Sequence, residues 1–554
     1  MSDADNQQQR KRAVRACRNC RRKKTRCSGE RPICAICQRL GQHCHYPAID
    51  VVDYGTRPGN EQIDALQTKM SIIENQLTEL TNTINSRVRP PGHMSTSTPG
   101  WTQGQAMTWA DAASIKESNQ AQPSVFSVLP GTNVLLSAAD AYFRHCHNQP
   151  YSLFHEETFR RDLVLGIVPA HLAFAFLATS IRFLSDPAYT ADKVTWISGY
   201  ARESWKAIVL SGEGLEKTAG ISVVQALILL AVIDYTGGKC RAGWIKAGLA
   251  IRISSYLQLM LEPDQSLSII EQELRRRTFW SVYVLDTLIS CGRQRPPAIP
   301  KDNLKLHMPC GENSFQVGLL QEMPPLEVFA RGPADTSTLD AESPWTLLVL
   351  VASVFRSCLQ YIFQERVHHD EAPWHPGCRF AELEWALLQL ESTYGLGDSP
   401  IEKTRLLYMV DNDVSQHRVG PSVYAHALFH ASHCLLYHPF LLRRRLAKQE
   451  IKTPKSFLLR AFHSCETHST ALATLMSEAR NMGLTASASM YAYFCYLAGS
   501  IHTLSRHVKH PVITDEAASD EILASCLQHI KELCQYWDLA NSIVRDASHT
   551  IELY

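Results

Sequence analysis

Six cysteines near the N-terminus constrain the fold of this chain more than any other feature. Their spacing is C-x2-C-x6-C, six further residues, and then C-x2-C-x6-C again. Each C-x2-C can present two thiolates to one metal ion, and the third cysteine of each half closes the site. Three thiolates leave a tetrahedral zinc one ligand short, so two zinc ions are satisfied if one cysteine of each half bridges both. The predicted zinc ligands are Cys17, Cys20, Cys27, Cys34, Cys37 and Cys44.

Two other kinds of metal site were weighed against this shared cluster. Separate mononuclear fingers would need fourth ligands, and His43 and His45 could supply them only for the second half. An iron–sulfur cluster usually has a tighter run of cysteines and no use for the neighbouring basic residues. The spacing therefore favours a two-zinc cluster.

The two halves differ in the residues that lie between their ligands. Five of the six residues between Cys20 and Cys27 are basic, against one between Cys37 and Cys44. A charge run is usually a solvated surface or a nuclear-import signal. Here metal at both ends would hold a short helix rigid, and Lys and Arg suit phosphates and the O6 and N7 acceptors of guanine in the major groove. The first half is therefore predicted to read DNA, through Arg21, Arg22, Lys23, Lys24 and Arg26.

Charge is distributed unevenly along the chain, although the formal net charge is only +1. Residues 1–50 hold 12 Lys and Arg against 4 Asp and Glu, a balance of +8, while the remainder holds 43 against 50, a balance of −7. A basic head on a mildly acidic body is expected when one end meets a polyanion.

The cysteine segment resembles the zinc binuclear-cluster, or Zn(2)-Cys(6), family of fungal transcription regulators. The resemblance covers about 30 residues, from Cys17-Arg-Asn-Cys20 through Pro32 to Cys44. It implies that Cys17 and Cys34 bridge the two zinc ions. It also implies that Lys24, with Lys23 beside it, lies where the family inserts a helix end into a CGG triplet, and that Arg21 and Arg26 meet phosphates.

A heptad pattern follows a linker rich in prolines and glycines. Its apolar residues alternate spacings of three and four over three heptads, which predicts a short parallel coiled coil and a homodimer. Lys69 and Glu74 fall at g and e positions that pair across such a dimer. The alternative is an amphipathic helix packed on the body of the same chain. The predicted seam is Ile63, Leu66, Met70, Ile73, Leu77, Leu80 and Ile84.

From residue 132 the chain changes to long segments with helical periodicity, so an all-α body is predicted. Val223–Ile233 and Phe279–Leu285 are apolar around most of their circumference and should be core segments. The predicted helices are Leu135–Cys146, Ala170–Arg182, Ser222–Thr236, Arg241–Leu261, Ile269–Ser290, Trp345–Glu365, Arg379–Tyr394, Val423–Lys448, Leu458–Arg480, Ser487–Val508 and Ser519–Asp546. The predicted division is a basic tail (1–12), the zinc module (13–47), a linker (48–61), the coiled coil (62–88), a disordered linker (89–131) and the helical body (132–554).

Part of the body resembles the fungal-specific transcription factor domain, also called the middle homology region. The stretch Arg275-Arg-Arg-Thr-Phe-Trp-Ser-Val-Tyr-Val-Leu-Asp286 is similar to its signature, and Tyr142-Phe-Arg-His and Tyr437-His438-Pro439-Phe440 to other helices. The resemblance implies a regulatory role.

Enzymatic function has no support in the sequence. His426, His430 and His433 lie on one helical face and resemble metal ligands, but their apolar neighbours favour a packed helix with hydrogen-bonded histidines. No G-x-S-x-G, H-E-x-x-H or Rossmann fingerprint occurs. The polar N-terminus lacks a secretory signal and the longest apolar stretches are too short to span a membrane. The eleven scattered cysteines are therefore predicted to be small core residues.

The leading hypothesis is a nuclear, zinc-dependent transcription factor that regulates RNA polymerase II transcription. It would bind double-stranded DNA as a homodimer on paired CGG-like triplets, and the helical body would contact the transcription machinery or co-regulators and sense a small-molecule effector. The alternative is a ligand-binding helical scaffold whose zinc module mainly contacts other proteins. Acidic residues from Asp515 to Glu521 fit either an activation segment or, preferably, the start of a terminal helix.

Overall fold

The computed structural model divides into two compact units, Met1–Ser114 and Ile115–Tyr554. The predicted basic tail at 1–12, the linker at 48–61 and the dimer seam at Ile63–Ile84 lie outside the described residues. The structure describes residues 17–23, 25, 27–28, 33–44, 125–210, 219–291, 295–300, 304–330, 343–364, 372–399, 409–410, 413–414, 416–447, 453–484, 486–507 and 516–543.

Among the described residues of the first unit there are two short helices, one in each half of the cysteine repeat. Helix α1 (Arg18–Arg22) follows Cys17, and α2 (Ala35–Arg39) follows Cys34. Each helix therefore begins directly after the first cysteine of its half.

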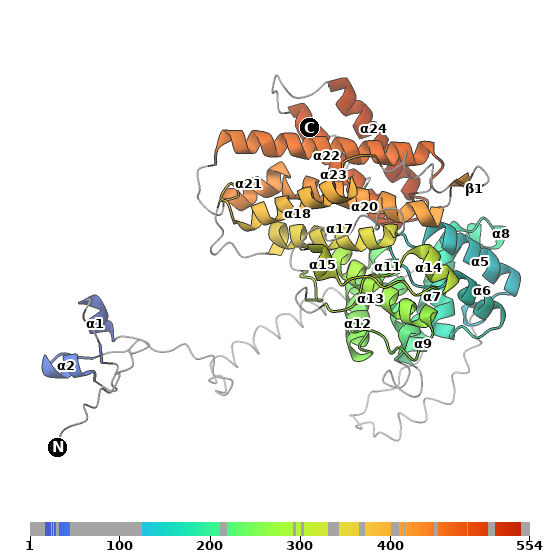
Figure 1. Ribbon diagram of the computed structural model, residues 1–554, viewed down its shortest axis with the longest axis horizontal. Helices are drawn as coiled ribbons and strands as arrows, with labels where there is room; N and C mark the ends of the chain where they lie inside the picture. Colours follow the sequence, from blue (N-terminus) through green and yellow to red (C-terminus); the bar gives the residue numbers. More distant parts are fainter. Residues whose placement is uncertain are drawn as a thin grey trace, which may run out of the picture. The chain divides into compact units, whose positions relative to one another are not determined.

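The second unit is built almost entirely of helices (Figure 1). The earlier helices of this unit are α5 (Thr132–His145), α6 (Glu156–Val164), α7 (Ala170–Ser180), η2 (Ile181–Phe183), α8 (Pro187–Thr190), α9 (Lys193–Val209), α11 (Ile221–Thr236), α12 (Cys240–Tyr256), α13 (Ile269–Ile289), α14 (Glu312–Val317) and α15 (Leu326–Ala330). The later segments are α17 (Pro344–Leu359), the π-helix η4 (Gln360–Gln364), α18 (Arg379–Tyr394), α20 (Gln416–Leu436), α21 (Pro439–Ala447), α22 (Lys455–Asn481), α23 (Met490–His507) and α24 (Glu516–Leu533).

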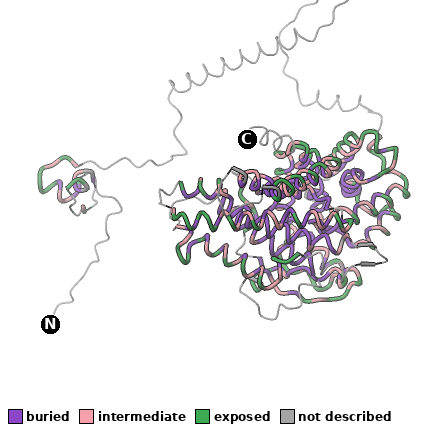
Figure 2. Tube along the Cα trace, turned by 90° about the horizontal axis from the view of Figure 1, so that it is seen from above, coloured by how far each residue is buried: buried purple, intermediate pink, exposed green. Residues whose placement is uncertain are grey.

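The earlier and later helices form two sides of this unit. Helices α7, α11 and α12 pack together on one side, and α17, α20, α22, α23 and α24 form a stack on the other. Figure 2 shows that the buried residues gather along the middle of the unit. Helix α13 contacts α11, α12 and α17, so it joins the two sides.

The most apolar segments occupy the core, as predicted. In α11 every residue from Val223 to Ala231 is buried, and in α13 every residue from Arg277 to Ile289. The segment Pro344–Phe363 has a mean hydropathy of 1.7 and the length of a membrane span. However, 83% of its apolar window is buried inside the protein. It is therefore the core helix of a helical body.

Helix ends are fixed by side chains that the sequence places at capping positions. Ser268 accepts a hydrogen bond from the amide of Glu271 at the start of α13, the first half of a capping box. Asp192 caps α9 in the same way through the amide of Thr195. Helices α6 and α9 were missed by periodicity, because both are short or partly exposed segments with few buried residues.

Two predictions about helices are corrected. The predicted helix Val423–Lys448 is two helices, α20 and α21, separated at Tyr437 and His438 because Pro439 cannot continue the preceding hydrogen-bond ladder. The predicted all-α body also contains one minimal hairpin, in which β1 (Met409–Val410) pairs antiparallel with β2 (Asp413–Val414). It is only two residues long on each strand, so the class remains all-α.

The end of the predicted disordered linker belongs to the helical unit instead. Residues Val125–Ser127 form a 3₁₀ turn (η1), and the ring of Phe126 packs edge-on against Trp196 at 5.1 Å and Tyr200 at 6.0 Å between centroids. A Cβ at Gly199 would lie 2.5 Å from Phe126, so only glycine leaves room for this ring. Phe126 thus makes an intramolecular contact with α9.

The scattered cysteines behave as small core residues. Seven of the eleven are buried, and the other four are half-buried. The acidic stretch near residue 516 begins helix α24, but that helix ends at Leu533 and not at Asp546, and a separate helical stretch follows at residues 538–543.

Candidate metal centre

The six predicted cysteines lie together in the first unit. Their sulfur atoms form two groups of four, Cys17, Cys20, Cys27 and Cys34 in one and Cys17, Cys34, Cys37 and Cys44 in the other. Within each group all four sulfur atoms lie within 4.8 Å of one another. Cys17 and Cys34 belong to both groups, which is the arrangement that the sequence resemblance implied. His43 is exposed and belongs to neither group.

The distances between these sulfur atoms fit tetrahedral zinc. A Zn–S bond of about 2.3 Å gives a tetrahedron whose S···S edges are about 3.8 Å. The sulfur of Cys17 lies 3.7 Å from those of Cys34 and Cys37, and the sulfur of Cys20 lies 3.7 Å from that of Cys34. Four thiolates at this spacing suit a closed structural zinc site with no open position for a substrate.

The two shared cysteines have the environment that a bridging thiolate needs. Burial alone raises the pKa of the Cys17 thiol, but a hydrogen bond from the amide of Cys20 and its thiol neighbours lower it overall. Burial also raises the pKa of the Cys34 thiol, but hydrogen bonds with the amide and the thiol of Cys37 lower it overall. Burial and contacts with Cys17 and Cys34 raise the pKa of the outer thiol of Cys20 to about 12. Among the cluster thiols whose pKa is shifted, only those of Cys17 and Cys34, which both groups share, have a lowered pKa.

Contacts outside the cysteines join the two halves of the module. The Asn19 side chain donates to the carbonyl of His43 at 3.0 Å, and the ammonium of Lys23 donates to Gln42 Oε1 at 2.8 Å. Ser28 Oγ accepts from the amide of Ala35, at the start of α2, at 2.9 Å. Sequence reasoning missed these residues because nothing local relates a polar side chain to the opposite half.

The basic residues predicted to contact DNA follow the first pair of cysteines. Arg22 and Lys23 are exposed at the end of α1, and Arg21 lies in the same helix. Lys24 and Arg26 lie outside the described residues. In the second half only Arg39 is basic among the residues between Cys37 and Cys44, and it is exposed at the end of α2.

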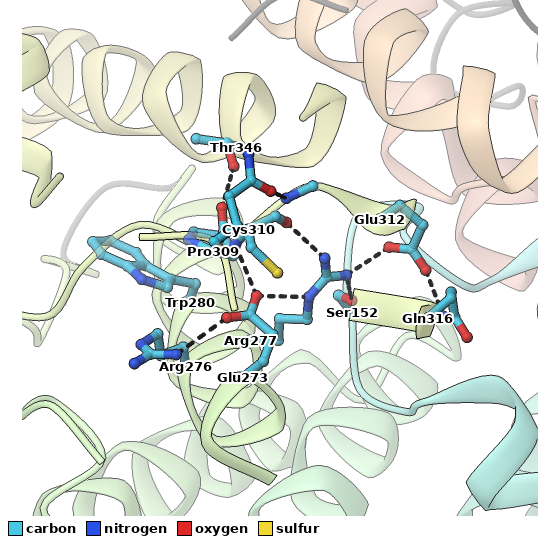
Figure 3. A network of polar contacts seen from close by, with 12 residues as sticks. Ser152, Glu273, Arg276, Arg277, Trp280, Pro309, Cys310, Glu312, Gln316 and Thr346 are labelled. Carbon is cyan, nitrogen blue, oxygen red and sulfur yellow. Dashed lines mark hydrogen bonds and ion pairs between the residues drawn. The ribbon is translucent and has the colours of Figure 1, made fainter. Parts of the chain in front are cut away.

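A network of polar contacts surrounds the buried Arg277 of the helical unit (Figure 3). Its guanidinium donates to Glu273 at 3.0 Å, to Ser152 at 2.9 Å, to Glu312 at 2.6 Å and to the carbonyl of Cys310 at 2.8 Å. Burial alone would raise the pKa of Glu312, but Arg277 and His147 hold that pKa well below its usual range. Every polar group of Arg277 is engaged, so the network is structural.

The rest of the signature segment 275–286 also holds distant parts of the chain together. Trp280 donates to the carbonyl of His307 at 2.8 Å. Asp286 accepts from the amides of Ala298 and Ile299 and pairs with Arg356 at 2.9 Å. These residues connect α13 with the loop at 295–300 and with α17, and none is placed for chemistry.

The three histidines that resembled metal ligands lie in α20 and are buried. His430 contacts His468 of α22 at 3.0 Å between their Nδ1 atoms, and the ring of His433 stacks on His468 at 3.7 Å. Among the described residues, the only groups with metal-ligand spacing are the two cysteine groups. The packed-helix interpretation therefore holds, but one part of it is wrong. Neither ring nitrogen of His433 has a hydrogen-bond partner among the described residues, and its ring is stacked on that of His468 instead.

Replacing His433 with phenylalanine should make the helical unit less sensitive to acid. Burial, together with His468 and His430, lowers the pKa of His433 well below 6.5 in the folded state. The unfolded chain therefore binds one more proton below pH ~6.5, and stability is lost as the pH falls. At pH 5 the variant should avoid a loss of about 2 kcal/mol, measured as the difference between urea unfolding at pH 7.5 and pH 5.

The exposed His463 of α22 provides the control for this comparison. Its replacement with glutamine should leave the pH dependence of unfolding unchanged. Equal acid sensitivity of the His433→Phe variant and the wild type would show that His433 is protonated in the folded protein.

Comparison with protein families identifies both parts of the chain. Residues 15–50 match the fungal Zn(2)-Cys(6) binuclear cluster domain, which binds two zinc ions. Residues 139–322 match the fungal specific transcription factor domain. The second match spans α5 to α14 and includes the Arg277 network.

Several curated proteins are similar over much of this chain. The Zn(2)-C6 fungal-type transcription factor FTF1c of Fusarium oxysporum f. sp. lycopersici is 24% identical, with 97% of this chain and 62% of that protein covered. FTF2 of the same organism is 25% identical, covering 54% of this chain and 32% of that protein. An uncharacterized transcriptional regulatory protein of Schizosaccharomyces pombe is 28% identical over 47% of this chain and 28% of its own length. The chain thus spans less than two thirds of the length of these relatives.

Proposed function

Because this chain belongs to the Zn(2)-C6 fungal-type transcription factors and not to an enzyme family, we propose that it is a zinc-dependent regulator of transcription that binds specific sequences in double-stranded DNA. The observation that carries the proposal is the pair of four-sulfur groups that share Cys17 and Cys34, with exposed basic residues at the end of α1. The regulated process is transcription by RNA polymerase II, which places the protein in the nucleus.

All six cysteines act as zinc ligands in this proposal. The two ions take up the charge of the buried thiolates, and the module then presents the helix end of its first half to DNA. Lys24 and Lys23 contact the bases of a CGG-like triplet, and Arg21, Arg22 and Arg26 contact phosphates. Base contacts determine sequence preference, whereas phosphate contacts determine position and salt dependence.

The protein binds DNA as a homodimer in this proposal, through a coiled coil at Ile63–Ile84. The apolar heptad positions support the homodimer, because such a pattern forms the seam of a coiled coil. A single basic helix end reads only a short triplet, so a second copy of the chain doubles the length of the DNA site. The helical body, in turn, contacts co-regulators or the transcription machinery and adjusts the response to a small-molecule effector.

Selection of DNA sites from a random pool with the full chain tests the proposal. Paired CGG-like triplets should be enriched, and a zinc chelator should abolish the enrichment. The Lys24→Ala variant should lose about 1–3 kcal/mol of discrimination at the triplet. Arg39→Ala, which removes an exposed basic residue from the second half, should leave the preferred sequence unchanged.

The outcomes of this selection separate the individual proposals. No enrichment at moderate salt would favour the alternative, a ligand-binding helical scaffold whose zinc module contacts proteins. Enrichment of single triplets, with one chain per DNA by native mass, would contradict the homodimer and leave DNA binding intact. Enrichment that survives in Lys24→Ala would assign base reading to another residue.

A further inference from the structure

A largely apolar cavity lies inside the helical unit. Its volume is about 260 Å³, and side chains from α5, α7, α11, α13, α20 and α23 line it, together with residues that follow α24. Three of these elements, α20, α23 and the segment after α24, lie beyond the segment 139–322 that matches the family domain. The cavity therefore forms where the family-matched helices meet the C-terminal helices.

The wall of the cavity carries no formal charge at neutral pH. Among the described residues that line it there is no Asp, Glu, Lys or Arg. Burial raises the pKa of the Tyr235 phenol and of the Cys146 thiol to about 12, and lowers the pKa of His145 to about 4. Arg295 contacts Tyr235 but does not line the cavity. A charged molecule would lose its hydration here and gain no counter-charge.

One wall residue offers a hydrogen bond that nothing in the described part of the chain accepts. The hydroxyl of Tyr424, in α20, is fully buried and makes no hydrogen bond to any described residue. Buried polar groups are nearly always hydrogen-bonded, and Tyr424 is one of the residues that line the cavity, so a molecule bound there is a candidate partner for this hydroxyl. Burial, with Tyr151, Tyr491 and Cys291 nearby, raises the pKa of Tyr424 well above 10. The group is therefore a donor at neutral pH.

The size of the cavity limits the ligand. A 150 Å³ apolar cavity in another protein accommodates benzene. By proportion, 260 Å³ holds on the order of ten non-hydrogen atoms. A ligand held wholly inside the cavity is therefore smaller than a nucleotide or a long acyl chain.

We propose that this cavity is an effector site for an uncharged, mainly apolar small molecule with one hydrogen-bond acceptor, which accepts from Tyr424 Oη. The ligand would contact helices from both sides of the unit at once. By binding only when α20 and α23 are packed against α11 and α13, it would stabilise their association. The inference concerns the helical unit alone and is independent of DNA binding by the zinc module.

Titration of the full chain with three related probes tests the site. The probes are 2-naphthol, which is neutral and carries one hydroxyl, naphthalene, which lacks it, and 2-naphthoate, which is anionic. Calorimetry and the shift in melting temperature should show that 2-naphthol binds and 2-naphthoate does not. In the Tyr424→Phe variant the affinity for 2-naphthol should fall about tenfold, and the affinity for naphthalene should stay the same.

Two further variants control for folding and for the site itself. Tyr283→Phe removes another buried hydroxyl that has no partner among the described residues, but Tyr283 does not line the cavity, so binding should be unchanged. Ala488→Leu adds volume at the wall and should weaken binding of both neutral probes. Binding of 2-naphthoate as tight as that of 2-naphthol, equal loss in Tyr424→Phe and Tyr283→Phe, or no binding of either neutral probe would overturn the proposal. DNA-site selection with the same preparations distinguishes this failure from failure of the DNA-binding proposal.

Discussion

Replacing Cys34 with alanine is expected to remove both zinc ions and unfold the N-terminal module. Cys34 belongs to both four-sulfur groups, so its loss leaves each zinc with three thiolates. The module has no other core, because its buried cluster among the described residues consists of Cys17, Cys20, Cys34 and Cys37. Zinc binding in comparable small modules contributes about 10–16 kcal/mol, which is their folding free energy.

Zinc content and folding can be measured on the same sample. Inductively coupled plasma mass spectrometry of the full chain should give two zinc ions for the wild type and none for Cys34→Ala. Specific DNA binding should disappear with them. The helical unit should keep its helical circular dichroism and its melting transition, since the two units are compact separately.

Cys27 provides a matched control, because it belongs to only one of the two groups. Cys27→Ala should weaken one zinc site more than the other, and the loss of zinc during chelator titration should then occur in two steps. Retention of two zinc ions by Cys34→Ala would contradict the shared-ligand arrangement. Equal and complete loss in both variants would show that the second zinc depends on the first through folding and not through a shared ligand.

Replacing Arg277 with methionine should destabilise the helical unit by about 3–5 kcal/mol, because Glu273 and Glu312 lose their buried cation and Glu273 keeps a longer ion pair with Arg276, at 3.4 Å. Glu273 and Glu312 both pair with this guanidinium, at 3.0 Å and 2.6 Å, and the side chain of Arg277 is 1% exposed. Urea unfolding of the full chain followed by tryptophan fluorescence measures the loss. Arg275→Met, one helical position away from the network, should cost less than about 1 kcal/mol, since Arg275 makes only a surface pair with Glu271.

The pH dependence distinguishes a lost ion pair from lost packing. In the wild type the pKa of Glu312 is lowered, so its contribution is present above the unfolded pKa of about 4.3 and is lost as the pH falls through the folded value. In Arg277→Met the carboxylate has lost its partner and its pKa should rise. The stability difference between the two proteins should therefore shrink below pH ~4. A constant difference from pH 7 to pH 4 would mean that methionine simply packs badly.

Rescue by a second substitution gives an independent check. Adding Glu312→Gln to Arg277→Met removes one of the two carboxylate charges that have lost Arg277 and should recover part of the lost stability. The same Glu312→Gln change in the wild-type background should be destabilising, because it removes a charge that Arg277 needs. Additive effects of the two substitutions would indicate that they do not interact.

Much of the architecture could be predicted from local sequence. The six cysteines fixed the metal and the pairing of halves because the spacing between ligands along the chain sets which thiolates can reach one ion. Helices such as α11 and α13 were predicted because their apolar residues leave few exposed faces. The end of α20 before Pro439 could also have been predicted from local sequence, because proline ends a helix, but Val423–Lys448 was predicted as one helix.

Other features depend on residues that are far apart in the sequence. Arg277 donates hydrogen bonds to Ser152 and Glu312, which are distant from it in the sequence. The ring of Phe126 likewise occupies a space that exists because residue 199 is glycine. The signature at 275–286 could be recognised as a pattern, but the reason for its charged residues appeared only in the contacts of α13. The sequence did not show whether His433 is hydrogen-bonded; in the described part of the chain its ring stacks on His468 and its nitrogens have no partner.

The amino-acid sequence by itself determined the two-zinc cluster, the position of the basic residues beside it and the helical class of the body. These follow from ligand spacing, charge and periodicity, which are properties of neighbouring residues. Only the tertiary structure decided that Tyr424 lines an uncharged cavity, with a hydroxyl that no described residue pairs with, and that Arg277 joins α13 to α14. Cavities and buried ion pairs arise where elements remote in sequence meet, so no local pattern specifies them.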